Sequence, residues 1–208
     1  MTAGLLNFRK SPPRVQRIIG LTGGISTGKS TVSKYLAVHH HLPVFDADIY
    51  ARQAVMPGSS AFAQIIDRYG SHLLLADGTI DRLQLAEIIF KNNTEKHWLE
   101  SIIHPYVREC FDRDIQQAAS STVVAVIPLL FEAQLQDTVT EVWVVACEPA
   151  QQLARLQQRD GLNFEQSQMR IASQMALTEK IKLADVILDN SGSETELLAQ
   201  IDRLLATA

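Results

Sequence analysis

A glycine-rich segment of eight residues, 23–30, restricts this chain to few possible architectures. It contains Gly-Gly-Ile-Ser-Thr-Gly-Lys-Ser and fits the pattern G-x-x-x-x-G-K-[ST]. A short apolar run at 17–22 precedes it, and residues 31–40 follow with Val32 and Leu36 one helical turn apart. Such glycines let backbone N–H groups converge on a phosphate at the start of a helix. The pattern predicts a strand, a phosphate-binding loop (the P-loop, residues 23–30) and a helix; a turn that binds nothing is the alternative.

Four further apolar runs predict the remaining strands of a sheet. They cover residues 43–45, 122–127, 141–146 and 184–188. Continuous apolar runs separated by helices are typical of a parallel sheet that helices cover on both faces. We therefore expect an α/β fold, a three-layer P-loop NTPase core with a five-stranded parallel sheet.

Helical spacing dominates the long stretch between the second and third of these strands. We expect a leader at 1–16, a nucleotide-binding core at 17–48 and 122–208, and a helical acceptor-binding insertion at 49–121. Within the core, Arg155 and Arg159 lie four residues apart on a helix that begins near Pro149, and Asp160-Gly161 ends that helix. This pattern indicates a small helical lid over about 155–175 that closes over a triphosphate; a solvated helical hairpin is the alternative.

Composition narrows the class of protein. The 208 residues include 19 basic and 23 acidic side chains, a net charge of −4, which argues against a sequence-independent nucleic-acid coat. No apolar run approaches the roughly 20 residues that span a bilayer, and the first 17 residues do not favour a secretory signal. Two cysteines are too few for a disulfide framework or a zinc site. We expect a cytoplasmic protein, a monomer or weak homo-oligomer, with small-molecule partners and neither nucleic acid nor membrane.

The P-loop predicts a nucleotide site with Mg²⁺. Lys29 would reach the β- and γ-phosphates, and the Ser30 hydroxyl would ligate the metal. The residues expected to contact ATP are Gly23, Gly24, Ile25, Ser26, Thr27, Gly28, Lys29, Ser30 and Thr31.

Two aspartates follow the second strand, where ligands bind in open α/β sheets. A kinase acting on a hydroxyl needs a carboxylate that accepts its proton, and either Asp46 or Asp48 can serve. The alternative is that the pair only caps the next helix. The chain has no Asn-Lys-x-Asp guanine reader, which disfavours a GTPase.

With these segments in view, the sequence resembles the dephospho-coenzyme A kinase family from about residue 17 to its end. The resemblance rests on residues 21–32, Asp46–Arg52, His104-Pro105, Pro128–Glu132, Arg159–Gly161 and Ala184–Gly192. It implies transfer of the γ-phosphate of ATP to the ribose 3′-hydroxyl of dephospho-CoA, the last step of coenzyme A biosynthesis, with Mg²⁺ accompanying ATP.

The resemblance also implies roles for particular residues. Its catalytic residues match Asp48 as the base, Lys29, and the lid arginines Arg155 and Arg159. Adenine of ATP would lie near Asn190 and Gly192. The acceptor would meet Asp46, Arg52, His104 and Arg108, although a histidine before proline is also typical of a structural bend.

The P-loop departs from the family pattern at one position. The family usually has Gly-Ser where this chain has Ser26-Thr27. Ser26 must then adopt the backbone conformation that glycine allowed, and a positive φ there would cost about 1 kcal/mol or more.

Two other functions stay open from the residues alone. One is a kinase for another nucleoside or small alcohol, because a P-loop with a lid does not define its acceptor. The other is a nucleotide-binding switch, which would hydrolyse ATP slowly without any acceptor. Dependence of the rate on an acceptor separates these readings.

Overall fold

A computed structural model of the chain describes residues 16–206, except the side chains of residues 90 and 91. The leader expected at 1–16 lies outside the described residues apart from Gln16, whose Nε2 donates to the Ser120 carbonyl at 3.1 Å.

Five strands form one sheet in the order β2–β3–β1–β4–β5, and every neighbouring pair is parallel. The strands are β1 (Arg17–Gly23), β2 (Val44–Asp46), β3 (Thr122–Val126), β4 (Glu141–Ala146) and β5 (Val186–Asp189). The central strand β1 places Ile19 beside Val124 of β3 and Glu141 of β4. The five-stranded parallel sheet expected from the apolar runs is confirmed.

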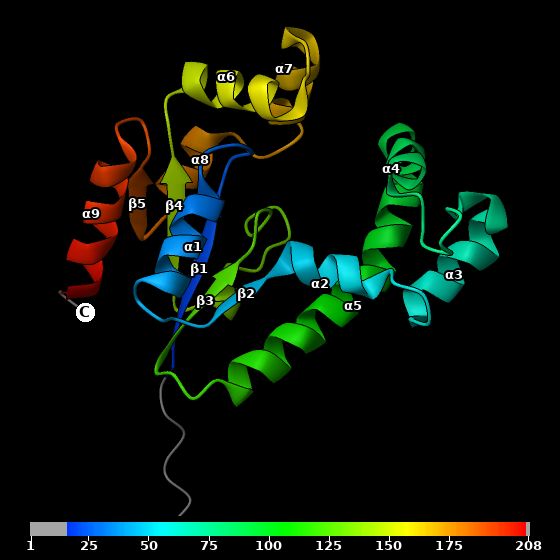
Figure 1. Cartoon of the computed structure of the whole chain (residues 1–208), viewed down its shortest axis with the longest axis horizontal. Coiled ribbons are helices and arrows are strands. Elements are labelled where there is room, and N and C mark those ends of the chain that lie inside the picture. Colours follow the sequence, from blue (N-terminus) through cyan, green and yellow to red (C-terminus); the bar gives the residue numbers. More distant parts are fainter. Residues whose placement is uncertain (1–15, 207–208) are drawn as a thin grey trace, which may run out of the picture.

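Helices cover both faces of this sheet (Figure 1). On β4, Trp143 and Val145 pack on one face with α1 (Lys29–Val38) and α9 (Glu194–Ala206). Val142 and Val144 pack on the other face with α2 (Ala47–Ala54), α5 (Asn93–Gln117) and α8 (Leu177–Lys182). Because both faces are buried, the central strands β1, β3 and β4 carry apolar side chains on both faces.

The helices between β2 and β3 extend away from the sheet and have an apolar cluster of their own (Figure 1). They include α2 and α5 together with α3 (Ser60–Tyr69), η1 (Ser71–Leu73) and α4 (Arg82–Lys91). The cluster is centred on buried Ile65, Leu73 and Leu99. Apolar spacing in the sequence begins the long helix at Trp98, whereas the polar segment Asn92-Asn93-Thr94 is typical of a helix cap; α5 begins at Asn93, as the cap indicates. Its polar first turn lacks apolar periodicity and is stabilised by the Asn92 side chain, which accepts from Thr94 N at 2.9 Å.

Two helices form a hairpin above the carboxyl ends of the strands (Figure 1). They are α6 (Pro149–Asp160) and α7 (Phe164–Ala172). Gly161, at φ 66°, ends α6, and Asn163 caps α7 in a capping box. A short η2 (Gln136–Thr138) completes the loop between β3 and β4. Within residues 16–206, no helix has the length and apolar content needed to cross a bilayer.

Candidate active site

The P-loop connects the end of β1 to the start of α1 and requires glycine at two positions. Gly23 has φ 150° and Gly28 has φ 109°. A Cβ atom at Gly23 would lie 2.4 Å from the Val145 carbonyl oxygen, and one at Gly28 would lie 2.1 Å from Asn190 Nδ2. Neighbouring backbone and side chains therefore press against the loop and fix its shape.

Three polar side chains bond to carbonyl oxygens of the P-loop: Gln152 and Asn190 from outside the loop and Thr27 from within it. Gln152 Nε2 donates to the Ile25 carbonyl at 2.9 Å, and Asn190 Nδ2 donates to the Thr27 carbonyl at 2.8 Å. The Thr27 hydroxyl donates to the Gly24 carbonyl at 2.9 Å. Since these bonds occupy carbonyl oxygens, they do not compete with a phosphate for the amides at the start of α1.

Ser26 adopts the positive φ that its place in the loop predicts. Its φ is 58°, in the left-handed region that disfavours residues other than glycine. Its hydroxyl oxygen is buried and finds no hydrogen-bond partner among the described residues. The loop thus tolerates a strained backbone and an unpaired polar atom at one residue.

Replacing Ser26 with glycine is expected to raise the melting temperature of the nucleotide-free protein. The change relieves about 1 kcal/mol of backbone strain and removes a buried unpaired hydroxyl. Greater freedom of the unfolded chain offsets part of this gain, about 0.4–1 kcal/mol. The net rise should be about 2 °C by differential scanning calorimetry. An unchanged or lower melting temperature would contradict the account of strain.

Lys29 lies folded back onto the loop. Its Nζ donates to the carbonyls of Gly24 at 2.7 Å and Gly23 at 3.2 Å. Burial, together with the nearby charge of Lys180, lowers the pKa of Lys29 to about 8, against the opposing charge of Asp48. A partly desolvated ammonium group at this point is poised to gain from an incoming phosphate.

The lowered pKa of Lys29 predicts a pH dependence of ATP binding. Only the ammonium form attracts phosphate, so the dissociation constant of ATP should be flat below about pH 7, about double near pH 8, and rise by more than about tenfold by about pH 9.5 as the free protein loses this proton. Titration calorimetry across this range measures the effect. The Lys29→Arg variant stays charged and should show no such rise; parallel curves for both proteins would refute the assignment.

Asp46 and Asp48 have different roles in the fold. Asp46 is the N-cap of α2, and its side chain accepts from Asp48 N at 2.8 Å. The Asp48 carboxylate is not used as a cap. Burial raises the pKa of Asp48, as does the charge of Asp46, while the charges of Arg52, Lys29 and Arg82 oppose the rise. The capping alternative therefore applies to Asp46, and the Asp48 carboxylate has no capping role.

These aspartates and the P-loop share one pocket, here called the phosphate pocket. Its polar lining includes Ser26, Lys29, Ser30, Ser33, Asp46, Asp48, Arg159 and Gln174. Cations, carboxylates and hydroxyls thus meet at the carboxyl end of the sheet, the place that parallel α/β folds use for ligands.

The two arginines of α6 point to different partners. Arg159 lines the phosphate pocket and makes two bonds to Asp160, at 2.7 and 3.1 Å. Arg155 instead donates through Nη2 to the Asn190 carbonyl at 3.0 Å. Its buried Nη1 has no partner among the described residues. Spacing four apart therefore does not bring both guanidinium groups to one place.

The residues expected to meet an acceptor lie toward the insertion. His104 and Arg108 are exposed on α5 and line a pocket with Ala47 and the loop after β3. Arg52 is exposed in the last turn of α2.

Near the last strand, Gly192 approaches Glu196 so closely that a Cβ would lie 2.4 Å from its Oε2. Thr31 N donates to the Gly28 carbonyl at 3.0 Å within the first turn of α1.

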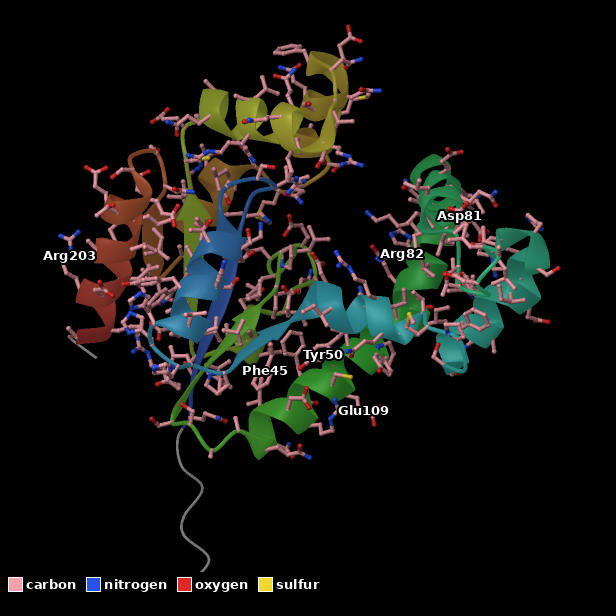
Figure 2. All side chains as sticks on the ribbon, viewed as in Figure 1. Phe45, Tyr50, Asp81, Arg82, Glu109 and Arg203 are labelled. Atoms are coloured by element: carbon pink, nitrogen blue, oxygen red, sulfur yellow. The ribbon has the colours of Figure 1, made fainter. Side chains whose placement is uncertain are left out.

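Sequence reasoning missed several residues around the pocket. Gln152, Gln174 and Lys180 carry no motif, because what matters is their contact with a loop far away in sequence. Arg82 had a usable signal. It opens α4 (Figure 2), where a cation is unfavourable for the helix dipole, and its charge acts on Asp48.

The site combines a P-loop with a carboxylate that caps no helix, at the carboxyl end of a five-stranded parallel sheet and beneath a hairpin that carries arginines. This combination defines the class of P-loop kinases. The family model described as dephospho-CoA kinase matches residues 17–196. A dephospho-CoA kinase from Trichormus variabilis is 58% identical over 187 residues, 90% of this chain and 95% of that protein. The chain therefore belongs to the dephospho-CoA kinase family.

Solved structures agree with this assignment. TT1252 from Thermus thermophilus superposes with a TM-score of 0.80 at 31% identity, covering 92% of this chain and 97% of that one. The dephospho-CoA kinase from Campylobacter jejuni gives a TM-score of 0.68 at 28% identity, covering 91% and 95%.

Proposed function

We propose that this chain transfers the γ-phosphoryl group of ATP to the ribose 3′-hydroxyl of dephospho-CoA, giving CoA and ADP. The observation that carries the proposal is Asp48, a solvent-accessible carboxylate that caps no helix and lies in the same pocket as Lys29. The Asp48 carboxylate accepts the hydroxyl proton as the 3′-oxygen bonds to the γ-phosphorus. The bond from that phosphorus to the β-phosphate oxygen breaks, and ADP leaves with the electron pair.

The P-loop and the α6 arginines stabilise the charge on the phosphates. Lys29 exchanges its carbonyl partners for the β- and γ-phosphates, and Arg159 faces the transferring group from the hairpin. We place Arg155 on the adenosine side, because it is bonded to Asn190 and keeps one unpartnered nitrogen. We place Gly192 on the adenosine side as well. The proposed ATP contacts remain those of the P-loop, Thr31, Asn190 and Gly192.

Mg²⁺ fits the oxygen donors of the phosphate pocket. The Ser30 hydroxyl at the start of α1 lies with the carboxylates of Asp46 and Asp48 on one pocket lining. Mg²⁺ prefers such ligands together with substrate phosphates and water rather than a cage made only of protein. Ser30 would hold the ion, which neutralises phosphate charge when bound.

The helical insertion, proposed as residues 49–121, binds the acceptor. An apolar pocket lies between α2, α5 and the loop after β3, next to Asp48, with Leu99, Ile103 and Leu135 in its lining. A nucleoside can pack on such a surface, while Arg52, His104 and Arg108 supply polar contacts around it. Asp46, at the hinge between core and insertion, sets the direction of α2.

The direct test measures ADP release from MgATP with and without dephospho-CoA, with the product analysed by mass. We expect a rate that depends on dephospho-CoA and a product heavier by one phosphate. Acceptor-independent hydrolysis would instead favour a nucleotide switch, and phosphorylation of another alcohol but not of dephospho-CoA would reassign the acceptor.

We place this reaction in the cytoplasm, with the protein a monomer or weak homo-oligomer that binds no nucleic acid. Both cysteines, Cys110 and Cys147, are buried free thiols, which suits a reducing compartment. The negative net charge disfavours nucleic acid.

A further inference from the structure

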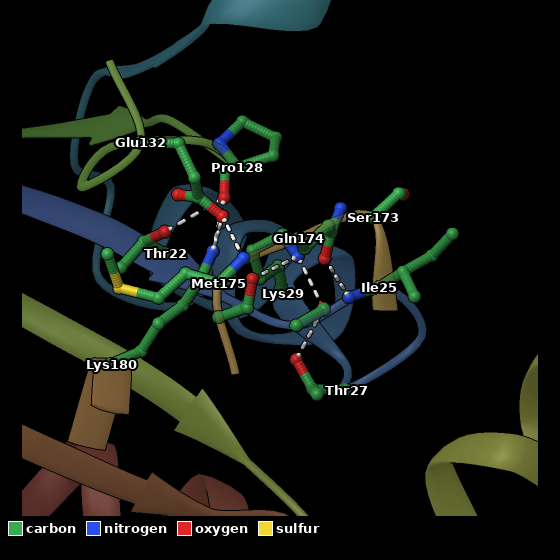
Figure 3. Close-up of polar contacts among 12 residues, drawn as sticks. Thr22, Ile25, Thr27, Lys29, Pro128, Glu132, Ser173, Gln174, Met175 and Lys180 are labelled. Carbon is green, nitrogen blue, oxygen red and sulfur yellow. Dashed lines mark hydrogen bonds and ion pairs between the residues drawn. The ribbon is translucent and has the colours of Figure 1, made fainter. Parts of the chain in front are cut away.

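Gln174 lies beside the P-loop and has no role in the mechanism above. It lies in the short segment between α7 and α8, and its side-chain Oε1 accepts from Ile25 N at 2.9 Å. The contact joins residues 149 positions apart in sequence. Figure 3 shows Gln174 close to Ile25 and Lys29, with the contacts of the following residue drawn beside them.

The chemistry of this bond fixes the orientation of the amide. A backbone N–H can only donate, so the atom that faces Ile25 must be the oxygen Oε1. The Nε2 group, with its two N–H bonds, therefore points elsewhere. It has no hydrogen-bond partner among the residues that the structure describes, and Gln174 is a half-buried part of the phosphate-pocket lining.

The residue after Gln174 is held firmly to the core. Met175 N donates to Glu132 Oε1 at 2.9 Å, and the same oxygen pairs with Lys180 Nζ at 2.9 Å. Lys180 is fully buried and also donates to the Pro128 carbonyl at 3.1 Å. A buried cation requires such partners, so this network resists displacement and keeps the segment against the P-loop (Figure 3).

The residues that share the pocket with Gln174 indicate that its Nε2 amide would meet the γ-phosphate rather than the β-phosphate of ATP. The phosphate pocket also contains Asp48, the acceptor-side base, and Arg159 from the hairpin. Gln174 shares this lining with Asp48 and Arg159, which the proposed mechanism places at the acceptor hydroxyl and the γ-phosphoryl group. The β-phosphate is served instead by amides at the start of α1.

We propose that Gln174 is a further catalytic residue, whose Nε2 amide donates a hydrogen bond to a γ-phosphoryl oxygen of ATP while its Oε1 stays bonded to Ile25 N. The inference rests on the proposed binding of ATP at the P-loop. A fixed donor of this kind stabilises the charge that develops on the transferring group and costs no reorganisation during the reaction.

Two variants separate this role from simple support of the loop. Gln174→Glu keeps an oxygen for Ile25 N but removes the donor and adds negative charge. Gln174→Met is neutral and removes both. The binding of MgATP and of MgADP is measured by calorimetry without acceptor, followed by kcat with dephospho-CoA. Both variants should bind ATP at least about tenfold more weakly, bind ADP within about twofold of wild type, and lose kcat at least about tenfold.

A matched control carries the same charge change elsewhere. Gln158 is exposed on α6, and Gln158→Glu should leave both affinities and kcat at wild-type values. Equal losses of ATP and ADP affinity in both Gln174 variants would reduce Gln174 to loop support and overturn the proposal. So would a Gln174→Met variant with wild-type ATP affinity and kcat, since charge repulsion alone would then explain the glutamate. If the wild-type protein itself bound no ATP, the proposed function would fail instead.

Discussion

Replacing Asp48 with asparagine is expected to lower kcat by at least about tenfold, and by as much as about 10⁴-fold, while ATP still binds. Asparagine keeps the shape of the side chain but cannot accept the acceptor proton. The fold should persist, because Asp48 caps no helix and its raised pKa shows that the folded protein disfavours this carboxylate charge. Steady-state kinetics and ATP titration measure the two effects.

The Asp46→Asn variant is the comparison for this experiment. Asparagine is also a good N-cap, so α2 should remain capped. The loss of kcat should be smaller than in Asp48→Asn. Because the charge of Asp46 raises the pKa of Asp48, its removal lowers that pKa. The acid side of the pH profile, where activity falls as Asp48 gains a proton, should then move to lower pH. A larger loss in Asp46→Asn than in Asp48→Asn would transfer the base role to Asp46.

Replacing Lys29 with alanine should nearly abolish turnover, with a loss on the order of 10²–10³-fold or more. Its ammonium group is the P-loop cation that can leave the carbonyls of Gly23 and Gly24 for the phosphates. At pH 7 the lowered pKa means that the folded protein holds this proton less tightly than the unfolded chain, so burial of the charge costs stability. The melting temperature of the variant should accordingly stay equal or rise.

Lys34→Ala provides the control for the lysine experiment. Lys34 is exposed on the same helix α1, and its removal changes the net charge equally. It should retain wild-type turnover. Substantial activity in Lys29→Ala, with Lys34→Ala unaffected, would refute the role of Lys29 in the P-loop.

The sequence alone determined the sheet and the P-loop, because both depend on local patterns. Continuous apolar runs identify strands buried on two faces, and the glycine spacing of 23–30 specifies its own loop. The positive φ of Ser26 agrees with the expectation from the family resemblance, since the family usually has glycine at this position. Apolar spacing alone missed the start of α5, because its first turn is polar; the capping residues Asn92-Asn93-Thr94 mark it instead.

Only the tertiary structure decided which side chains near the P-loop cap a helix, which line the phosphate pocket and which bond to the loop itself. Whether Asp46 or Asp48 is free depends on one hydrogen bond of 2.8 Å, which either aspartate could have made as judged from sequence. The separate partners of Arg155 and Arg159 depend on where the last strand and the hairpin pack. Gln174 meets Ile25 because the chain returns to the P-loop after α7. Such contacts join segments far apart in sequence, and packing of the whole domain, rather than any local spacing, brings them together.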